Sequence, residues 1–151
     1  MAEIPAETGA MCHWPTVQAM PNARESLKVL STMAHCHLAT NAKDSAPYDI
    51  MRALVRVGLD SFLGRIFCFR AIGHTTPSVE FFEYIANDLQ VRPQALIRVG
   101  DDLEKDVLGA QAQGLQAVWY NPQCRPVPTG IVAIRNLLEL PRMTQHIKWR
   151  D

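Results

Sequence analysis

Three aspartates stand close together in the segment Val99-Gly100-Asp101-Asp102-Leu103-Glu104-Lys105-Asp106. The apolar residues before Gly100 predict a strand and the residues after it a helix, so the carboxylates follow a strand end. Asp102 and Asp106 are four residues apart and could share one helix face, while Asp101 extends from the strand end. Carboxylate oxygens held in this way suit Mg²⁺, which takes one or two protein carboxylates and fills its octahedron with water and substrate phosphate.

Helix capping is the alternative explanation of the same carboxylates. Acidic side chains in the first turn of a helix interact favourably with the helix dipole, by roughly 0.3–1 kcal/mol each. Capping accounts for Asp102 or Glu104. It does not account for Asp101, because a carboxylate beside two others is repelled by them unless a cation is bound there. The sequence therefore predicts Asp101 as a metal ligand, with Asp102 as a further candidate.

A second candidate site follows the apolar segment that ends at Thr40. A hydroxyl at a strand end, followed by backbone N–H groups, can receive a phosphate oxygen. Thr40 and Asn41 are therefore candidates for substrate binding. The alternative is a turn without a ligand, since Thr-Asn is also common there.

The segment His35-Cys36-His37 places two potential metal ligands on one side of a predicted strand. Two ligands do not complete a site, and the nearby candidates Cys12 and His13 lie in a segment without periodicity. The four cysteines are scattered without a C-x-x-C pair, so we expect free thiols that are mostly buried.

Helical and strand-like segments alternate from Asn22 onward, and this pattern predicts a three-layer, Rossmann-like α/β domain with a parallel sheet. Residues 1–21 hold three prolines and no periodicity, so we interpret them as an extension before a core of residues 22–151. The predicted strands are 35–40, 65–69, 95–99, 116–120 and a short 131–134. The predicted helices are 22–33, one capped by Asp44 or Ser45 and ended by Gly58, one begun by Thr76-Pro77, 104–113 and a last turn at 137–140.

The composition excludes several classes of protein. Fifteen basic and fifteen acidic residues cancel, so neither nucleic acid nor an anionic membrane is an expected partner. No apolar run approaches the roughly 18 residues of a transmembrane span, and the first residues lack the features of a signal peptide. We therefore expect a cytoplasmic protein. Nucleotide binding through a P-loop or a G-x-G-x-x-G motif is excluded because neither occurs.

From Pro21 to Pro141 the chain resembles the haloacid dehalogenase-like hydrolases. Pro21-Asn22-Ala23-Arg24-Glu25 is similar to the start of the helix that follows the family's cap domain. His37-Leu38-Ala39-Thr40-Asn41 is similar to the family's second motif, an apolar strand that ends in serine or threonine. Val99 to Asp106, followed by Val107-Leu108-Gly109-Ala110-Gln111-Ala112 and Gly114, resembles the fourth motif and its helix closely. The resemblance implies a Mg²⁺-dependent phosphohydrolase. The resemblance implies that Asp101 is a direct Mg²⁺ ligand and that Asp106 is an acidic residue that supports the metal site without binding the ion directly. It also implies that Thr40 and the Asn41 amide bind the phosphate.

The sequence departs from the family pattern at two motifs. The family's first motif, D-x-D, supplies the nucleophile and the acid, but no two aspartates here are separated by one residue. Thr76 stands where the third motif has a lysine, and threonine cannot replace a cation. We therefore expect this chain to be catalytically incomplete, with weak Mg²⁺ binding. The family's first strand lies at the centre of the sheet, between the strands ending at Thr40 and Val99, and it is predicted to be missing.

Three explanations remain open: a true start that lies upstream, a gene remnant, or a pseudoenzyme that acts as a binding or scaffold module. A receiver domain also uses clustered aspartates, but its acidic pair follows the first strand. If the protein is active, a small phosphorylated metabolite is the expected substrate. A sheet that lacks a strand leaves backbone groups unpaired, so a homo-oligomer is a further expectation.

Overall fold

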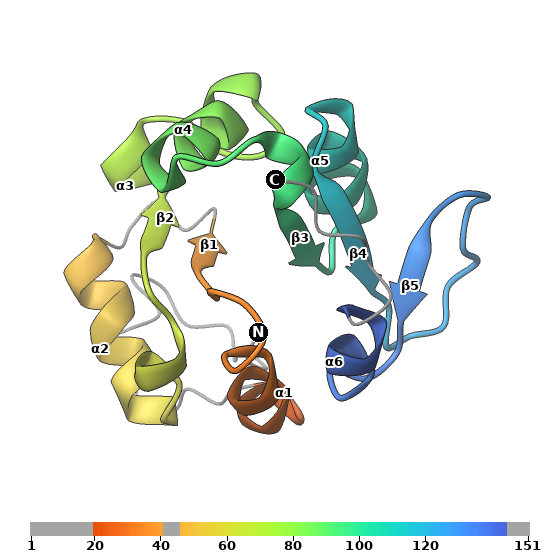
Figure 1. The fold of residues 1–151 in the computed structure, drawn as a ribbon, viewed down its shortest axis with the longest axis horizontal. Helices are drawn as coiled ribbons and strands as arrows, with labels where there is room; N and C mark the ends of the chain where they lie inside the picture. The colour runs from red at the N-terminus through yellow and green to blue at the C-terminus, as the bar shows by residue number, and fades with distance from the viewer. Residues whose placement is uncertain (1–19, 41–45, 145–151) are drawn as a thin grey trace, which may run out of the picture. The chain divides into compact units, whose positions relative to one another are not determined.

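The computed structural model describes residues 20–40 and 46–144. The chain divides into two compact units, Met1–Thr75 and Thr76–Asp151. Helices and strands alternate in both, and every strand pair is parallel (Figure 1). The predicted α/β class is thus confirmed. The helices in the described ranges all fall short of the length and apolar character that a membrane-spanning helix needs.

The first unit contains a two-stranded parallel sheet, in which Leu38 pairs with Ile66 and Thr40 with Cys68. Helix α2 contacts β2, and the short α3 continues directly from it. The unit's elements are α1 (Ala23–Leu30), β1 (Leu38–Thr40), α2 (Pro47–Val57), η2 (Asp60–Phe62), β2 (Ile66–Cys68) and α3 (Phe69–Ile72).

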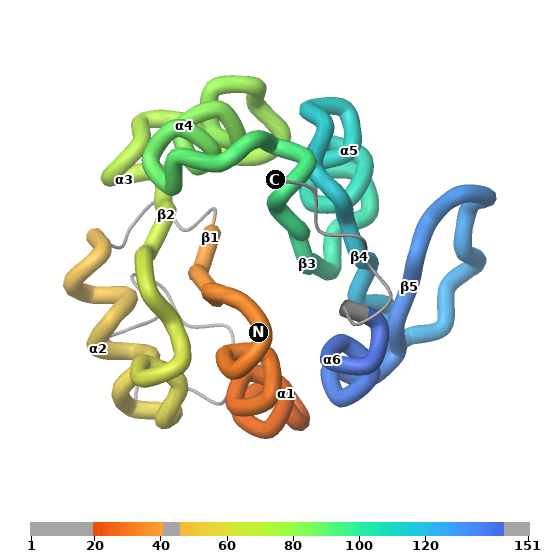
Figure 2. The backbone as a smooth tube through the Cα atoms, in the orientation of Figure 1, coloured from red at the N-terminus to blue at the C-terminus, as the bar shows by residue number. Residues whose placement is uncertain are grey.

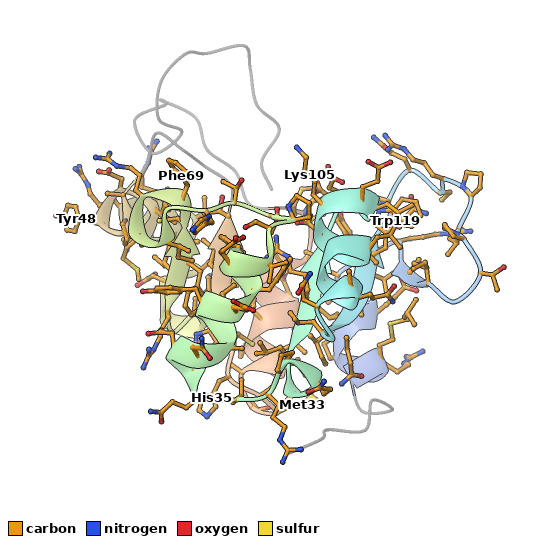
Figure 3. All side chains as sticks on the ribbon, turned by 90° about the horizontal axis from the view of Figure 1, so that it is seen from above. Met33, His35, Tyr48, Phe69, Lys105 and Trp119 are labelled. Atoms are coloured by element: carbon orange, nitrogen blue, oxygen red, sulfur yellow. The ribbon has the colours of Figure 1, made fainter. Side chains whose placement is uncertain are left out.

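Local chemistry explains the bounds of α2. Proline stands at the first helical position, where its missing N–H costs nothing, and the Asp49 carboxylate accepts the Ala46 N–H at 3.1 Å. The helix ends at Gly58, whose φ of 73° is a conformation that a side chain disfavours. Ile50 and Leu54 are buried, whereas Tyr48 projects outward and is 72% exposed (Figure 3).

The second unit contains a three-stranded parallel sheet in the order β3-β4-β5. Val99 pairs with Val118, and Trp119 pairs with Gly100 on one side and Ala133 on the other. The unit's elements are α4 (Val79–Leu89), η3 (Pro93–Ala95), β3 (Ile97–Gly100), η4 (Leu103–Leu108), α5 (Gly109–Ala112), β4 (Gln116–Tyr120), β5 (Val132–Ile134) and α6 (Glu139–Thr144).

Apolar side chains from α4, η4 and the sheet fill the core of this unit. Phe81 and Phe82 are buried and meet edge to face, with ring centroids 5.8 Å apart. Val107 on η4 and Val118 on β4 are also fully buried, and η4 contacts both β3 and β4. This packing fixes the helix that follows the aspartate segment against the strands that precede and flank it.

The connection from β4 to β5 is a long excursion that can be followed in Figure 2. It begins at Asn121, whose backbone N–H donates to the Ile134 carbonyl at 2.7 Å. The Asn121 side chain accepts the Arg125 N–H and donates to the Arg125 carbonyl, at 3.0 and 2.9 Å. The amide thereby closes a turn at the start of the connection.

Several predicted bounds were wrong. Asn22 precedes α1 but adopts a left-handed conformation and makes no side-chain cap. The third helix begins at Val79 rather than at Thr76-Pro77, because Ser78 caps it by accepting the Phe81 N–H at 3.3 Å. His35 to His37 lie outside β1, and Phe69 begins α3 instead of ending a strand. The predicted caps Asp44 and Ser45 lie outside the described residues.

Three further expectations also need correction. The helix predicted over 104–113 is a π-helix over Leu103–Leu108 followed by the α-helix Gly109–Ala112. Ala95 belongs to a 3₁₀ turn, and the strand after it runs from Ile97 to Gly100. The strands of the single predicted sheet form two sheets, β1-β2 and β3-β4-β5, one in each unit.

Candidate active-site turn after β3

The turn after β3 is held to the neighbouring strand through Trp119. Gly100 ends β3 and pairs with Trp119 on β4, and the indole Nε1–H of Trp119 donates to the Asp101 carbonyl at 3.0 Å. Trp119 is only 3% exposed, so its indole has little freedom to move. The backbone of Asp101 is therefore fixed against the sheet.

The Asp106 carboxylate points back into the protein. Its Oδ1 accepts a hydrogen bond from Arg98 Nη2 at 2.7 Å, and its Oδ2 accepts the Asp102 N–H at 3.2 Å. The two side chains of this ion pair, Arg98 and Asp106, are 14% and 9% exposed. A Cβ added at Gly100 would collide with the Asp106 carboxylate, so this position needs glycine for close approach.

Asp102 caps the helix that follows the turn. Its carboxylate accepts the Lys105 N–H at 2.9 Å, and its carbonyl accepts both the Asp106 N–H at 2.9 Å and the Val107 N–H at 3.3 Å. The bond to Val107 spans five residues and gives η4 its π geometry, which is frequent at functional sites. The capping explanation thus describes Asp102. Lys105 itself projects to the surface (Figure 3).

Asp101 differs from its two acidic neighbours. Its side chain is exposed and has no protein partner within residues 20–40 and 46–144, whereas those of Asp102 and Asp106 both accept backbone or ionic hydrogen bonds. In those same ranges, no three His, Cys, Asp or Glu side chains gather closely enough to hold a metal ion. An exposed carboxylate without a partner among these residues is the donor chemistry that suits Mg²⁺, since this ion binds through one or two protein carboxylates and keeps water in its other positions.

The segment that resembles the third motif packs against α5. Thr76 is buried, with 4% exposure, and the Thr76-Pro77 peptide bond is cis. A Cβ added at Gly109, the first residue of α5, would come within 2.6 Å of Pro77 Cβ. This contact fixes the segment to the helix that continues η4.

The other candidate residues, Thr40 and Asn41, belong to the first unit. Thr40 is buried at the end of β1, opposite Cys68. Asn41 lies outside the described residues.

His35-Cys36-His37 is part of the packing of the first unit. His37 Nδ1 accepts the Arg65 N–H at 2.9 Å, and the ring meets Phe67 edge to face. Burial raises the pKa of the Cys36 thiol, which disfavours the thiolate that binds metals. No group of three potential ligands forms around them among the described residues, and Cys12 and His13 lie outside those residues.

Sequence reasoning missed Arg98 and Trp119. Arg98 is the single charged residue in the segment Leu96-Ile97-Arg98-Val99-Gly100, and a lone cation in a buried strand is a signal that an acidic partner is nearby. Trp119 carried no comparable signal, because an indole in an apolar strand is typical of an ordinary core position.

The fold and this turn define a class of protein: α/β proteins that carry an acidic turn at the carboxyl end of a parallel strand. Residues 75–122, which include the turn, match the family model described as HAD-hydrolase-like. The putative HAD-hydrolase YfnB of Bacillus subtilis is 28% identical over 127 residues, 82% of this chain and 53% of that protein. Human N-acylneuraminate-9-phosphatase is 38% identical over 78 residues, 47% of this chain and 31% of that protein.

Solved structures agree. The crystal structure of YfnB bound to magnesium superposes with a TM-score of 0.72 at 26% identity, covering 82% of this chain and 55% of that one. The 2-haloacid dehalogenase of Pseudomonas syringae gives a TM-score of 0.73 at 26% identity, with coverages of 85% and 54%. The chain belongs to the haloacid dehalogenase-like superfamily of hydrolases. It spans about half the length of the curated relatives it matches first.

Proposed function

We propose that this chain is part of a phosphatase-type, Mg²⁺-dependent hydrolase of the haloacid dehalogenase-like superfamily. The observation that carries the proposal is the exposed Asp101 carboxylate, which has no partner among the described residues and stands on a turn held by Trp119 and Asp106. In this role Asp101 binds the cation, Asp102 supplies a second oxygen or orients a bound water, and Asp106 supports the turn from behind. Mg²⁺, when bound, neutralises charge on the phosphoryl oxygens.

Phosphate binding is assigned in this proposal to Thr40 and Asn41. A threonine hydroxyl and a backbone amide at a strand end match the acceptor oxygens of a phosphate group. Curated relatives described as phosphatases, among them N-acylneuraminate-9-phosphatase, support a small phosphorylated metabolite as the substrate class.

We further propose that this 151-residue chain does not hydrolyse phosphomonoesters by itself. It has no D-x-D motif, and Thr76 replaces the lysine of the third motif. Binding a phosphate and a cation in the ground state does not accelerate the reaction unless the transition state is stabilised further. A non-catalytic binding module on the same fold is the second candidate, because the same missing motifs favour it.

The test combines isothermal titration with Mg²⁺ and an assay with p-nitrophenyl phosphate, on the purified chain and on Asp101→Asn. We expect weak Mg²⁺ binding that Asp101→Asn abolishes, and no turnover above background in either protein. Glu83→Gln, which removes an exposed carboxylate from α4, is the matched control and should bind as the wild type does.

Three results would contradict the proposal. Mg²⁺ binding that survives Asp101→Asn would remove Asp101 as the ligand. Tight binding abolished by Asp101→Asn would mean that the cation site is complete in this chain. Turnover that disappears in Asp101→Asn would mean that another residue replaces the missing nucleophile.

A further inference from the structure

The ion pair between Arg98 and Asp106 connects the strand to the turn that follows it. Arg98 lies on β3, two residues before Gly100, and Asp106 lies on η4. The Nη2–Oδ1 distance is 2.7 Å, and both side chains are largely buried. Removing one partner of such a pair leaves an uncompensated charge with little access to water. The position of Asp106 therefore depends on Arg98.

Asp106 in turn holds the backbone of the turn. Its Oδ2 accepts the Asp102 N–H, and its carboxylate fills the space over Gly100 that a Cβ would occupy. Asp101 lies between Gly100 and Asp102, and its carbonyl accepts a hydrogen bond from the Trp119 indole. A shift of Asp106 would therefore move both neighbours of Asp101 and reorient the exposed carboxylate.

We propose that Arg98 is a positioning residue: through Asp106 it sets the turn at 100–102 and so raises the affinity of the Asp101 carboxylate for a divalent cation. The inference rests on the proposed function, since it assumes that Asp101 binds the cation. Arg98 itself does not touch the ligand in this arrangement.

Electrostatics alone predicts the opposite change in Mg²⁺ affinity when Arg98 is removed. The direction of the measured change therefore tests the inference. A positive charge near a cation site repels the cation, so removing Arg98 should strengthen binding if charge alone mattered. Positioning predicts weaker binding, because supporting groups behind metal ligands typically contribute about 10–100-fold in affinity.

The experiment uses the full chain with Trp14→Phe and Trp149→Phe, which leaves Trp119 as the single tryptophan. Its indole N–H resonance in a ¹H–¹⁵N spectrum reports the bond to Asp101, and titration with MgCl₂ gives the dissociation constant. The variants are Arg98→Met, Arg98→Lys and the double variant Arg98→Met/Asp106→Asn. Arg92→Met is the matched control, because it removes an exposed positive charge from the same unit away from the turn.

We expect Arg98→Met to shift the indole resonance and to weaken Mg²⁺ binding about tenfold. Arg98→Lys should have a smaller effect, because the lysine ammonium keeps the positive charge and lacks only the planar donor group of arginine. Arg98→Met/Asp106→Asn should recover part of the affinity, because the amide oxygen introduced by Asp106→Asn still accepts the Asp102 N–H, while the buried charge is gone. A purely electrostatic role predicts the reverse order, with Arg98→Met binding Mg²⁺ more tightly than the wild type and the double variant binding it more weakly than Arg98→Met. Arg92→Met should leave both measurements unchanged.

Unchanged or tighter Mg²⁺ binding in folded Arg98→Met would overturn the inference, as would a double variant that binds more weakly than the single one. If Arg98→Met does not fold, Arg98→Lys decides: wild-type values of both measurements overturn the inference, and a shifted resonance with weaker binding supports it. Absence of Mg²⁺ binding in the wild type overturns the proposed function instead. The indole signal of the metal-free proteins then decides whether Arg98 sets the turn.

Discussion

At the scale of single residues, the Asp106 carboxylate explains why glycine stands at position 100. The carboxylate lies against the Gly100 backbone, accepts the Asp102 N–H and pairs with Arg98. The four-residue spacing of Asp102 and Asp106 predicted one shared helix face. The structure instead separates their roles, because the π turn places Asp106 behind the backbone and leaves Asp102 as the cap.

Gly100→Ala is expected to destabilise the protein by about 1–3 kcal/mol, the usual cost of an added methyl group in a filled site. Urea unfolding measures the change. The matched test repeats the substitution in an Asp106→Ala background, where the obstructing carboxylate is gone and the added cost should be smaller. Equal costs in both backgrounds would show that Asp106 is not what excludes a side chain at position 100.

At the scale of elements, a side-chain cap marks where α4 begins. Ser78 begins α4, although Thr76-Pro77 carries the sequence pattern of a helix start. Glu139, the first residue of α6, caps in the reverse direction: its carboxylate accepts the Arg135 and Asn136 N–H groups, which precede the helix, at 2.8 and 2.9 Å. Both caps join residues three or four apart, but which of several candidate residues caps a helix depends on the packing of the whole helix.

Ser78→Ala should lower the free energy of unfolding by about 1 kcal/mol, because the Phe81 N–H loses its acceptor. Thermal denaturation measures the loss, and Ser78→Asp, which keeps an acceptor, should be close to wild type. A full loss in Ser78→Asp would mean that the hydroxyl does not act as a cap.

The Glu139 cap predicts a pH dependence of stability. The backbone hydrogen bonds from Asn136 and Arg135 hold the pKa of Glu139 below its ordinary value. A carboxyl group with a lowered pKa stabilises the fold above its unfolded-state pKa, and this contribution is lost as the pH falls through the folded-state value. The difference in urea midpoint between wild type and Glu139→Gln should therefore be larger at pH ~7 than at pH ~3. Since Glu139 is exposed, the effect is small, and a constant difference across this range would contradict the cap.

At the scale of the whole molecule, the chain carries about half of the length of its relatives, in two compact units. The acidic turn lies entirely in the second unit, together with Thr76. The proposed phosphate-binding residues Thr40 and Asn41 belong to the first. The proposed activity also needs a nucleophile of the kind that the D-x-D motif supplies.

Thr76→Lys tests whether the third-motif lysine alone limits activity. We expect no hydrolysis of p-nitrophenyl phosphate, because a cation cannot replace a missing nucleophile. The variant should also be less stable, since Thr76 is buried and a lysine there would be charged without water. Thr76→Met, similar in length but uncharged, separates the effect of size from that of charge. Turnover in Thr76→Lys but not in Thr76→Met would contradict the expectation.

Local sequence patterns were sufficient to predict the class of fold, the strand 116–120 and the place of the acidic turn. These patterns are apolar runs long enough for a strand, a glycine at a strand end and carboxylates next to it. Which carboxylate is left without a partner among the described residues could be learned from the tertiary structure alone. Asp101, Asp102 and Asp106 have the same chemistry, and their roles diverge because Arg98 and Trp119, brought close by strand pairing and by the packing of η4 on β3, bind one carboxylate and one carbonyl of the turn.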